Sequence, residues 1–409
     1  MRLLFLSNYY PPTHNGGYEQ LCEEVAGEFT RRGHRIAVLT AGDHDGTRVI
    51  EEKGVQVRRL LHLEVEGGVG RTALRLLRDR ERLERENLDQ LRAAVESFRP
   101  DAILVWGMWN VPRSVPALAE QLMPGRVFYY ICDYWPSLPS AYLQQFQEPS
   151  TRSLTRWPKR ILGGPFVAEL TREKPVPLKL ERPICVSRAV RDLLGRSGVP
   201  VSHAEVIYNG IDIGNFPPTR MDEQRAEWGG LRFLYAGRLS PEKGVATAIR
   251  ALATLRVDRQ ATLDIVGSGD GSYVRTLKAL TGELRLDGRV AFRGSVPREE
   301  MGVVLAEHDA LLFPSEWEEP MARTVMEAMA VGLVVAGTTT GGTGELLVEG
   351  ETGLTFQAGD SNGLASQIER LLNDRALGQR LVVAARRRIE ENFTFQRMVD
   401  ELEGVLEEA

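Results

Sequence analysis

The chain has 409 residues, of which 43% are hydrophobic and 26% are charged, and its formal net charge at pH 7 is −5. This length exceeds one ordinary hydrophobic core, so we expect a globular protein of two domains. The negative balance argues against nucleic acid as a partner. The three cysteines, Cys22, Cys132 and Cys185, lack the spacing of a metal site and fit a reducing compartment.

The amino terminus reads MRLLFLSNYYPP, and its apolar run is too short for a signal peptide or a membrane span. We therefore expect a first strand at Leu3–Ser7 and a cytoplasmic protein. A helix follows, because Leu21, Val25 and Phe29 recur every four residues before Gly33.

Strand-length apolar runs alternate with stretches of helical period along the whole chain. Further strands are expected at Arg35–Thr40, Asp101–Val105, Arg126–Ile131, Pro183–Val186 and Glu205–Tyr208, and then at Arg232–Tyr235, Thr262–Val266, Arg289–Phe292, Ala310–Phe313 and Leu333–Ala336. The alternation predicts parallel sheets with right-handed crossovers. Because it occurs twice, we expect two Rossmann-like, doubly wound α/β domains, with ligands at the carboxyl ends of their strands.

The boundary between these domains is predicted from a stretch rich in turn residues, NGIDIGNFPPTRMDEQRAEWGG. The prediction gives a first domain at 1–212, a linker at 213–230 and a second domain at 231–395. Arg and Glu interleave between residues 71 and 92, which predicts one solvated, charged helix.

The stretch SEWEEPMARTVMEAMAVGLVV carries two glutamates around a predicted helix. Pro320 suits the first helical position and leaves Glu319 in the preceding loop. Glu327 lies on the flank of the helix, which Gly332 ends. Since helix N-termini bind anions, a phosphate-bearing ligand at this end of the helix could reach both glutamates. The alternative is two solvated glutamates on a surface helix.

Two further segments have the residues of a phosphate site. FLYAGRLSPEKG places Arg238 and Lys243 after a strand, where two cations suit a diphosphate. PPTHNGGYEQ places Gly16 and Gly17 before a helix, where the backbone can approach a phosphate or a sugar. A surface turn and a flexible turn are the respective alternatives.

Backbone groups at two other turns are weaker candidates. In VAFRGSVPREEM, Gly294 and Ser295 end a strand and could read the edge of a base; the alternative is a turn with Ser295 near a helix cap. TTTGGTGELL, with Gly341 and Gly342, is either another glycine-rich approach to the ligand or a loop without one.

Taken together, AGRLSPEKG, VAFRGSVP, LLFPSEWEEPMARTVMEAMAVGLVV, GGTGELLVEGETGLTF and VIYNGIDIGNF resemble the retaining glycosyltransferases of family four, which have the GT-B fold. SNYYPPTHNGG and RRGHRIAVLT look like the amino-terminal signature of that family, so the resemblance covers nearly the whole chain. It implies metal-independent transfer of a sugar, with retention, from a nucleotide-sugar donor (a UDP-sugar) to a hydroxyl acceptor: a glycan, a lipid-linked glycan or a small metabolite. It also implies that the last helix, 396–409, packs back on the first domain.

The resemblance further implies a role for each matching residue. Arg238 and Lys243 hold the donor diphosphate, Glu327 binds the ribose hydroxyls, and Glu319 contacts the transferred sugar. The remaining donor-binding positions are the glycine loop, the base-edge turn and the backbone after Glu319: Gly16, Gly17, Gly294, Ser295, Met321, Ala322, Arg323 and Thr324. The family commonly has Phe-Gly where this chain has Met321-Ala322, which leaves the donor sugar open.

One departure from the family pattern concerns catalysis. In VFYYICDYWP, Cys132 occupies the position of a usual His, and Asp133 follows. A thiol is a poor base at neutral pH, whereas the Asp133 carboxylate could stabilise positive charge at the anomeric carbon. Alternatively, Cys132 is a packing residue and Asp133 caps the next turn. His14, close to the glycine loop in the sequence, is a less favoured candidate for the role of that His.

Two other functions stay open at this point. One is a nucleotide-sugar epimerase of related fold, and the other is a non-catalytic sugar-nucleotide-binding subunit, which the absent His suggests.

The acceptor side is marked by aromatic and basic residues. Trp109, Tyr134 and Trp135 could stack on a sugar or line a lipid groove, or they could pack in a core. The stretch Thr151–Arg182 is rich in Arg and Lys around Trp157. It predicts either peripheral contact with anionic membrane at the inner face or a solvated loop.

Overall fold

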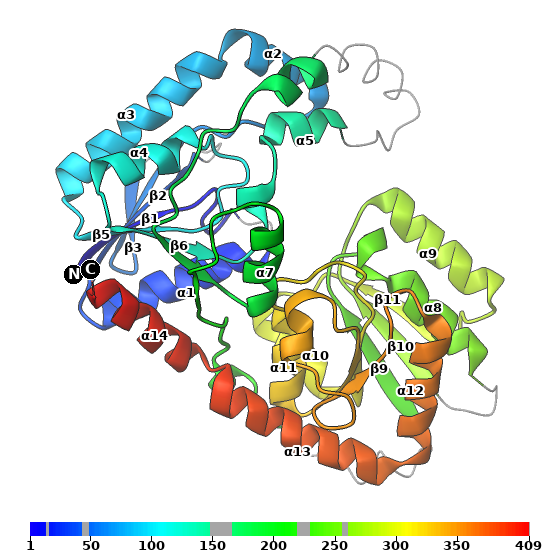
Figure 1. The fold of residues 1–409 in the computed structure, drawn as a ribbon. Helices are drawn as coiled ribbons and strands as arrows, with labels where there is room; N and C mark the ends of the chain where they lie inside the picture. Colours follow the sequence, from blue (N-terminus) through cyan, green and yellow to red (C-terminus); the bar gives the residue numbers. More distant parts are fainter. Residues whose placement is uncertain (14–15, 43–48, 148–165, 219–229, 256–260, 409) are drawn as a thin grey trace. The chain divides into compact units, whose positions relative to one another are not determined.

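The computed structural model describes residues 1–13, 16–42, 49–147, 166–218, 230–255 and 261–408. The chain divides into two compact units: Met1–Ile207 with Glu401–Ala409, and Tyr208–Asp400 (Figure 1). The division falls before the predicted boundary at 212. The described part of the predicted linker, 213–218, belongs to the second unit, where Phe216 is buried.

The first unit is built on an eight-stranded sheet with the order β3-β4-β2-β1-β5-β6-β7-β8. Its strands are β1 Arg2–Leu6, β2 Arg35–Ala41, β3 Val49–Glu52, β4 Val55–Leu61, β5 Ala102–Val105, β6 Val127–Ile131, β7 Arg182–Cys185 and β8 Glu205–Val206. All neighbours are parallel except β3 and β4. This hairpin was not predicted, because β3 is mostly exposed and β4 alternates apolar with polar residues.

Helices cover the first sheet. They are α1 Gly17–Arg31, α2 Val69–Arg78, α3 Arg80–Phe98, α4 Ser114–Leu122, α5 Ala141–Gln147 and α7 Arg188–Arg196, with a 3-10 turn, η1, at Trp135–Ser137. The single charged helix predicted between 71 and 92 is wrong: α2 and α3 are separate helices that meet at Asp79. The Asp79 carboxylate pairs with Arg82 at 3.0 Å at the start of α3.

The second unit is built on a six-stranded parallel sheet with the order β11-β10-β9-β12-β13-β14. Its strands are β9 Leu231–Ala236, β10 Ala261–Val266, β11 Val290–Gly294, β12 Ala310–Phe313, β13 Val334–Gly337 and β14 Leu354–Thr355. Its helices are α8 Val245–Thr254, α9 Gly271–Glu283, α10 Met301–Ala306, α11 Arg323–Val331, α12 Ser361–Asn373 and α13 Arg375–Asn392. Its 3-10 turns within the described residues are η2 Ile213–Asn215, η4 Pro241–Lys243, η5 Arg298–Glu300 and η6 Gly341–Glu345.

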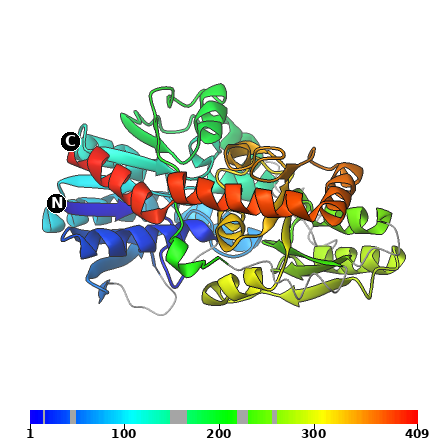
Figure 2. The same ribbon diagram turned by 90° about the horizontal axis from the view of Figure 1, so that it is seen from below.

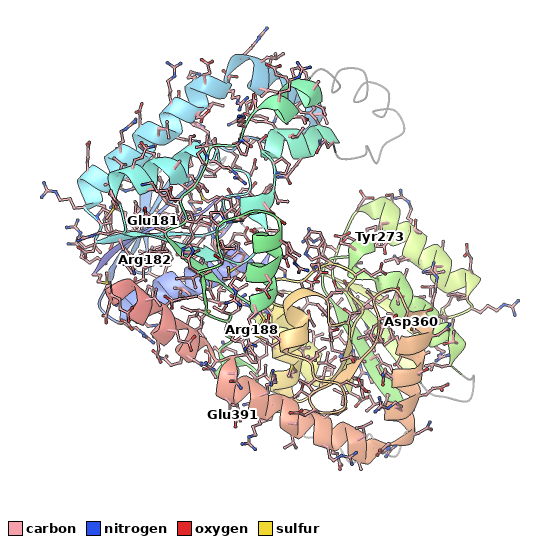
Figure 3. The ribbon with its side chains drawn as sticks, in the orientation of Figure 1. Glu181, Arg182, Arg188, Tyr273, Asp360 and Glu391 are labelled. Atoms are coloured by element: carbon pink, nitrogen blue, oxygen red, sulfur yellow. The ribbon has the colours of Figure 1, made fainter. Side chains whose placement is uncertain are left out.

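Carboxylate caps start the last helices of this unit. Asp360, labelled in Figure 3, accepts hydrogen bonds from the amides of Asn362 and Gly363 at the start of α12. Asp374 accepts one from the amide of Leu377 at the start of α13. Such caps satisfy amides that have no partner within the helix, so these two sequence positions fix where each helix begins.

The last helix, α14 Phe395–Glu407, follows α13 closely and carries the chain from the second unit into the first (Figure 2). Within the first unit, the Glu403 carboxylate pairs with Arg32 and lies 2.6 Å from Nε2 of His34. The end of α14 is thus attached to the turn after α1, and these contacts lower the pKa of the Glu403 carboxyl.

Each sheet has one switch point, on either side of which successive strands are added in opposite directions. In the first unit this point lies between β1 and β5, and in the second between β9 and β12. The loops after two such strands leave toward opposite faces of the sheet, which opens a crevice at the carboxyl edge. The segments after β1, β9 and β12 contain most of the predicted site residues.

Candidate active site

The predicted phosphate-binding cations of the second unit lie in the segment after β9. Arg238 is exposed, and its carbonyl accepts a hydrogen bond from the Tyr235 hydroxyl at 2.7 Å. Lys243 ends η4, and its Nζ lies 2.6 Å from Oε1 of Glu319. Gly244 has φ +67°, and a Cβ there would lie 1.9 Å from the carbonyl oxygen of Pro314. Glycine therefore allows the segment after β9 to contact the segment after β12.

Glu319 is the central carboxylate of this edge and is only 8% exposed. Its Oε1 accepts a hydrogen bond from Oγ of Ser315 at 2.6 Å, in addition to the Lys243 contact. Its carbonyl accepts one from the amide of Gly342 at 2.6 Å. Gly341 has φ +56°, and a Cβ there would lie 2.3 Å from the same carbonyl. Segments after three different strands therefore hold Glu319 in place.

The predicted start of the helix at Pro320 is wrong, because α11 begins at Arg323 with Ala322 as its N-cap. If the helix began at Pro320, the Glu319 carbonyl would accept the Arg323 amide. Gly342 occupies that carbonyl instead, so residues 320–322 stay outside the helix. Gly332 ends α11 with φ +98°, as predicted.

Glu327 is 1% exposed, in the second turn of α11. Its Oε1 lies 2.5 Å from Nη2 of Arg298 and 4.0 Å from Nε of Arg323. The Arg298 guanidinium also lies over the ring of Phe216, at 5.8 Å. The alternative of solvated surface glutamates is therefore wrong for both Glu319 and Glu327.

The other donor-side candidates lie close to these charged residues in the chain. Met321 and Ala322 are buried, whereas Arg323 and Thr324, at the start of α11, are partly buried. Gly294 and Ser295 are exposed at the end of β11. The carbonyl of Gly294 accepts a hydrogen bond from the amide of Gly267, which joins the ends of β10 and β11.

In the first unit, Gly16 is the N-cap of α1 and Gly17 is its first residue. Both are exposed, and the Gly16 amide donates to Oε2 of the buried Glu19 at 3.1 Å. The buried Arg59 of β4 anchors the earlier part of this loop by donating to the carbonyl of Tyr10 at 2.9 Å. His14 lies outside the described residues.

Cys132 and Asp133 directly follow β6, and both are partly buried. Oδ1 of Asp133 accepts a hydrogen bond from the Trp135 amide at 2.9 Å, just before η1, whose N-cap is Tyr134. Burial raises the pKa of the Asp133 carboxyl to about 6, and the negative charge of Glu19 adds to the rise. The carboxylate is therefore mainly ionised at pH 7. Cys132 forms no disulfide within the described residues.

The predicted acceptor-side aromatics are largely buried. Tyr134 and Trp135 are 6% and 2% exposed, and the Trp109 ring lies 6.0 Å from that of Tyr9. Both tryptophans also line a cavity of about 740 Å³ within the first unit. In the predicted membrane-binding stretch, residues 151–165 with Trp157 lie outside the described residues. Among the helices that are described, none has the length and apolar character needed to span a bilayer.

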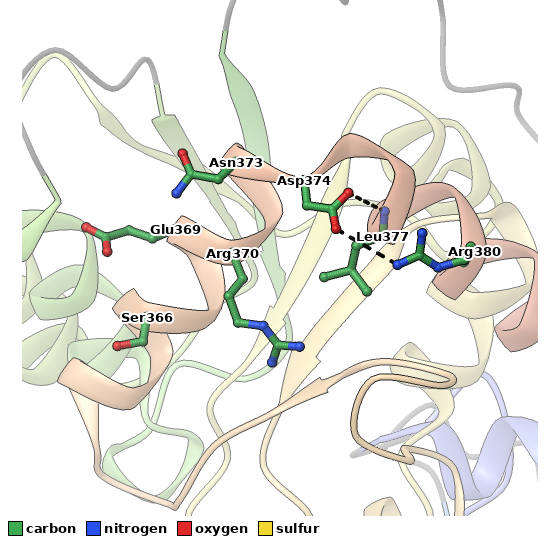
Figure 4. Close-up of a pocket in the computed structure, with 7 residues that line it drawn as sticks. All are labelled: Ser366, Glu369, Arg370, Asn373, Asp374, Leu377 and Arg380. Atoms are coloured by element: carbon green, nitrogen blue, oxygen red, sulfur yellow. Dashed lines mark hydrogen bonds and ion pairs between the residues drawn. The ribbon is translucent and has the colours of Figure 1, made fainter.

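A second cavity, of about 450 Å³, lies in the second unit along α12 and α13 (Figure 4). Its lining residues are Ser366, Glu369, Arg370, Asn373, Asp374, Leu377 and Arg380. None of them is a predicted site residue. Asp374 caps α13 and lies 3.9 Å from Arg380, while Arg370 pairs with Glu349 at 2.5 Å. The charged groups of this surface therefore stabilise the helices around it.

Sequence reasoning missed Ser315 and Arg298, the partners of the two glutamates. The signal for Ser315 was its position two residues after β12, at the carboxyl edge of the sheet. Arg298 follows β11 by four residues, in the segment where only Gly294 and Ser295 were chosen. Both are side chains placed by packing, so their partners could not be read from spacing.

Comparison with solved structures defines the class of fold. Sucrose-phosphate synthase from Thermosynechococcus elongatus superposes with a TM-score of 0.73 at 21% identity, over 100% of this chain and 98% of that one. HepE from Anabaena, in a complex with UDP-glucose, superposes with a TM-score of 0.70 at 22% identity, over 100% of both chains. The fold is GT-B.

The family follows from the sequence. The profile "Glycosyltransferase Family 4" matches residues 15–215, and the profile "Glycosyl transferases group 1" matches residues 221–388. The chain therefore belongs to the family-four glycosyltransferases. It is 33% identical over 199 residues to glycogen synthase from Mycobacterium tuberculosis, a match to 49% of this chain and 47% of that protein. The chain thus spans about half the length of the curated relatives it matches.

Proposed function

We propose that this protein is a retaining glycosyltransferase that moves a sugar from a UDP-sugar to a hydroxyl acceptor without a metal ion. The observation that carries the proposal is the Ser315–Glu319–Lys243 cluster at the switch point of the second sheet, next to Arg238. Family membership supports sugar transfer. The UDP-glucose bound by HepE supports a uridine donor.

In this proposal the donor is held by charge. Arg238, Lys243 and the positive end of the α11 dipole neutralise the leaving diphosphate. Glu327 accepts hydrogen bonds from the ribose hydroxyls, and Glu319 accepts them from the transferred sugar. Because Lys243 already pairs with Glu319, the cation and the carboxylate are oriented before the donor binds.

The chemical step takes place on one face of the sugar. The bond from the anomeric carbon to the phosphate oxygen breaks, and the acceptor oxygen bonds to the same face. The departing phosphate oxygen takes the acceptor proton, so Cys132 is not needed as a base. We assign to the Asp133 carboxylate the stabilisation of positive charge at the anomeric carbon.

A thermal-shift screen against UDP-, GDP- and ADP-sugars tests the donor, because a specific ligand raises apparent stability by mass action. We expect UDP-sugars to give the largest shift. Nucleotide release then tests the reaction: a transferase releases UDP faster with an acceptor present. An epimerase would convert the donor without an acceptor, and a binding subunit would show no turnover; either result would contradict the proposal.

We also propose that the protein is cytoplasmic and that Thr151–Arg182 contacts anionic membrane at its inner face. Flotation with liposomes at low and high salt tests this. Equal failure to float with neutral and anionic lipid would contradict membrane contact.

A further inference from the structure

The cavity of about 740 Å³ in the first unit has the size of a small-molecule site. It lies between the segments that follow β5 and β6 and residues 170–180. Its walls combine apolar residues and prolines, with Val111, Leu138 and Leu178 among them, with hydroxyl and charged side chains such as Ser114 and Thr171. Trp135 connects the cavity to the proposed reaction site, since its amide donates to Asp133 at 2.9 Å.

Arg113 is a partly buried cation of this cavity with nitrogens available to a ligand. Its Nη2 donates to the carbonyls of Pro136 and Leu138, at 2.5 and 3.0 Å. In the described part of the chain, no carboxylate comes within ion-pair distance of Arg113, and its Nε and Nη1 have no hydrogen-bond partner. Arg80, which also lines the cavity, differs because both its terminal nitrogens bind Glu173, at 2.6 and 2.7 Å.

The carboxylates that line the cavity do not neutralise the positive charge of Arg113. Glu173 is neutralised by Arg80. Glu64 accepts a hydrogen bond from the Ala141 amide at 2.6 Å, and burial raises the pKa of its carboxyl to about 7, so it is only partly ionised at neutral pH. Glu84 and the exposed Lys174 also line the cavity. Among the described residues, the partly buried Arg113 therefore lines the cavity without a carboxylate partner.

We propose that this cavity binds the body of the acceptor, and that the acceptor is an amphiphile with an apolar group against the proline-rich walls and a phosphate or carboxylate on Arg113. The inference rests on the proposed function. An uncharged glycan would leave the partly buried Arg113 guanidinium without a charged partner, which is unfavourable. An anion gains charge-assisted hydrogen bonds from the guanidinium.

Calorimetry with octyl phosphate tests the inference without requiring turnover. We expect octyl phosphate to bind at least about tenfold more tightly than octyl glucoside, which has the same chain and no charge, or inorganic phosphate, which has no chain. Arg113→Gln should lose at least about tenfold, and Arg113→Lys should keep most of the affinity. Val176→Asp should also weaken binding; Val176 lines the cavity and is 40% exposed, so this change leaves the core intact.

Two controls separate this inference from the proposed function. Arg82→Gln, an exposed arginine of α3, should change nothing. UDP affinity, measured on every sample, reports the donor site in the second unit. If UDP binds and octyl phosphate does not, or if Arg113→Gln binds octyl phosphate like the wild type, the cavity is not an anionic acceptor site. If UDP itself fails to bind, the proposed function is wrong.

The source of the anion is tested with vesicles of phosphatidylcholine that contain phosphatidic acid. Vesicle binding that requires Arg113 supports an acceptor carried by lipid. Binding of octyl phosphate without vesicle binding supports a soluble amphiphile. Vesicle binding that survives Arg113→Gln, without binding of octyl phosphate, contradicts the inference.

Discussion

The carboxyl edges of the two sheets differ in chemistry. In the second unit, buried carboxylates pair with cations, Lys243 with Glu319 and Arg298 with Glu327. In the first unit, the corresponding edge has exposed glycines, the carboxylate of Asp133 with a raised pKa, and a cavity whose walls are partly apolar. Paired charges suit a charged ligand group such as a diphosphate, whereas a cavity with partly apolar walls also selects its ligand by shape. The difference suggests that donor affinity is electrostatic and that acceptor choice depends on packing.

The largest expected effect comes from Glu319→Gln, which removes the central charge of the second edge. We expect turnover to fall by about 10²–10³, the usual loss for one preorganised electrostatic group. UDP affinity should not weaken, because Lys243 loses the carboxylate that neutralises it. Rates of nucleotide release and calorimetry with UDP measure the two effects. The exposed neighbour Glu318→Gln is the control; a Glu319 variant that lost UDP affinity and kept its turnover would reverse the assigned roles.

The next largest effect tests the phosphate contacts directly. Arg238→Ala and Lys243→Ala should each weaken UDP binding by about 1.5–3 kcal/mol, the scale of a charge-assisted hydrogen bond. The loss should shrink at high salt for Arg238, which is exposed. Arg275→Ala, an exposed change on α9, serves as the matched control. If both variants bound UDP with wild-type affinity, the diphosphate would not bind at this edge of the sheet.

Glu327→Gln sharpens the comparison within the second unit. The ribose hydroxyls would lose a charged acceptor, so free UDP should bind about tenfold more weakly, or about 1.4 kcal/mol. Because Arg298 also loses its ion-pair partner, unfolding should be followed in parallel. Unchanged UDP affinity in a normally folded variant would place the ribose elsewhere.

The smallest effects are expected in the first unit, at the segment after β6. Asp133→Asn should lower turnover at least about tenfold, or about 1.4 kcal/mol of transition-state stabilisation. Cys132→Ala should keep most activity. Initial rates at saturating donor and acceptor measure both. The reverse pattern, an inactive Cys132→Ala with an unaffected Asp133→Asn, would make the thiol the group that acts.

The pKa of Asp133 gives this test a pH signature. The carboxyl titrates at about 6, so the wild-type rate should fall as pH drops through 6 and protons neutralise the carboxylate. The residual activity of Asp133→Asn should not fall over this pH range. The effect of pH on stability has the opposite direction. The folded state binds the Asp133 proton more tightly than the unfolded state does. The wild type should therefore lose stability relative to Asp133→Asn as pH rises from about 4 to 6. Urea denaturation at several pH values measures this.

Much of the fold could be predicted because buried strands appear in the sequence as continuous apolar runs. The eleven predicted strands all occur in the structure, within a few residues of their predicted bounds. The hairpin β3–β4 and the short strand β14 were missed, since exposed or two-residue strands leave no apolar run. The end of α11 at Gly332 was predicted and its start was not, because a glycine C-cap is local while the partner of the Glu319 carbonyl, Gly342, is distant in the chain.

The sequence by itself determined the two parallel α/β domains, the family, and the types of residue at each strand end. These follow from periodicity and from short motifs, which act over a few residues. Only the tertiary structure decided that Lys243 and Glu319 pair, that Arg298 contacts Glu327, and that Arg113 lines a partly apolar cavity. Such contacts join side chains far apart in the sequence, and their partners and burial are set by how the loops pack together at the edge of a sheet.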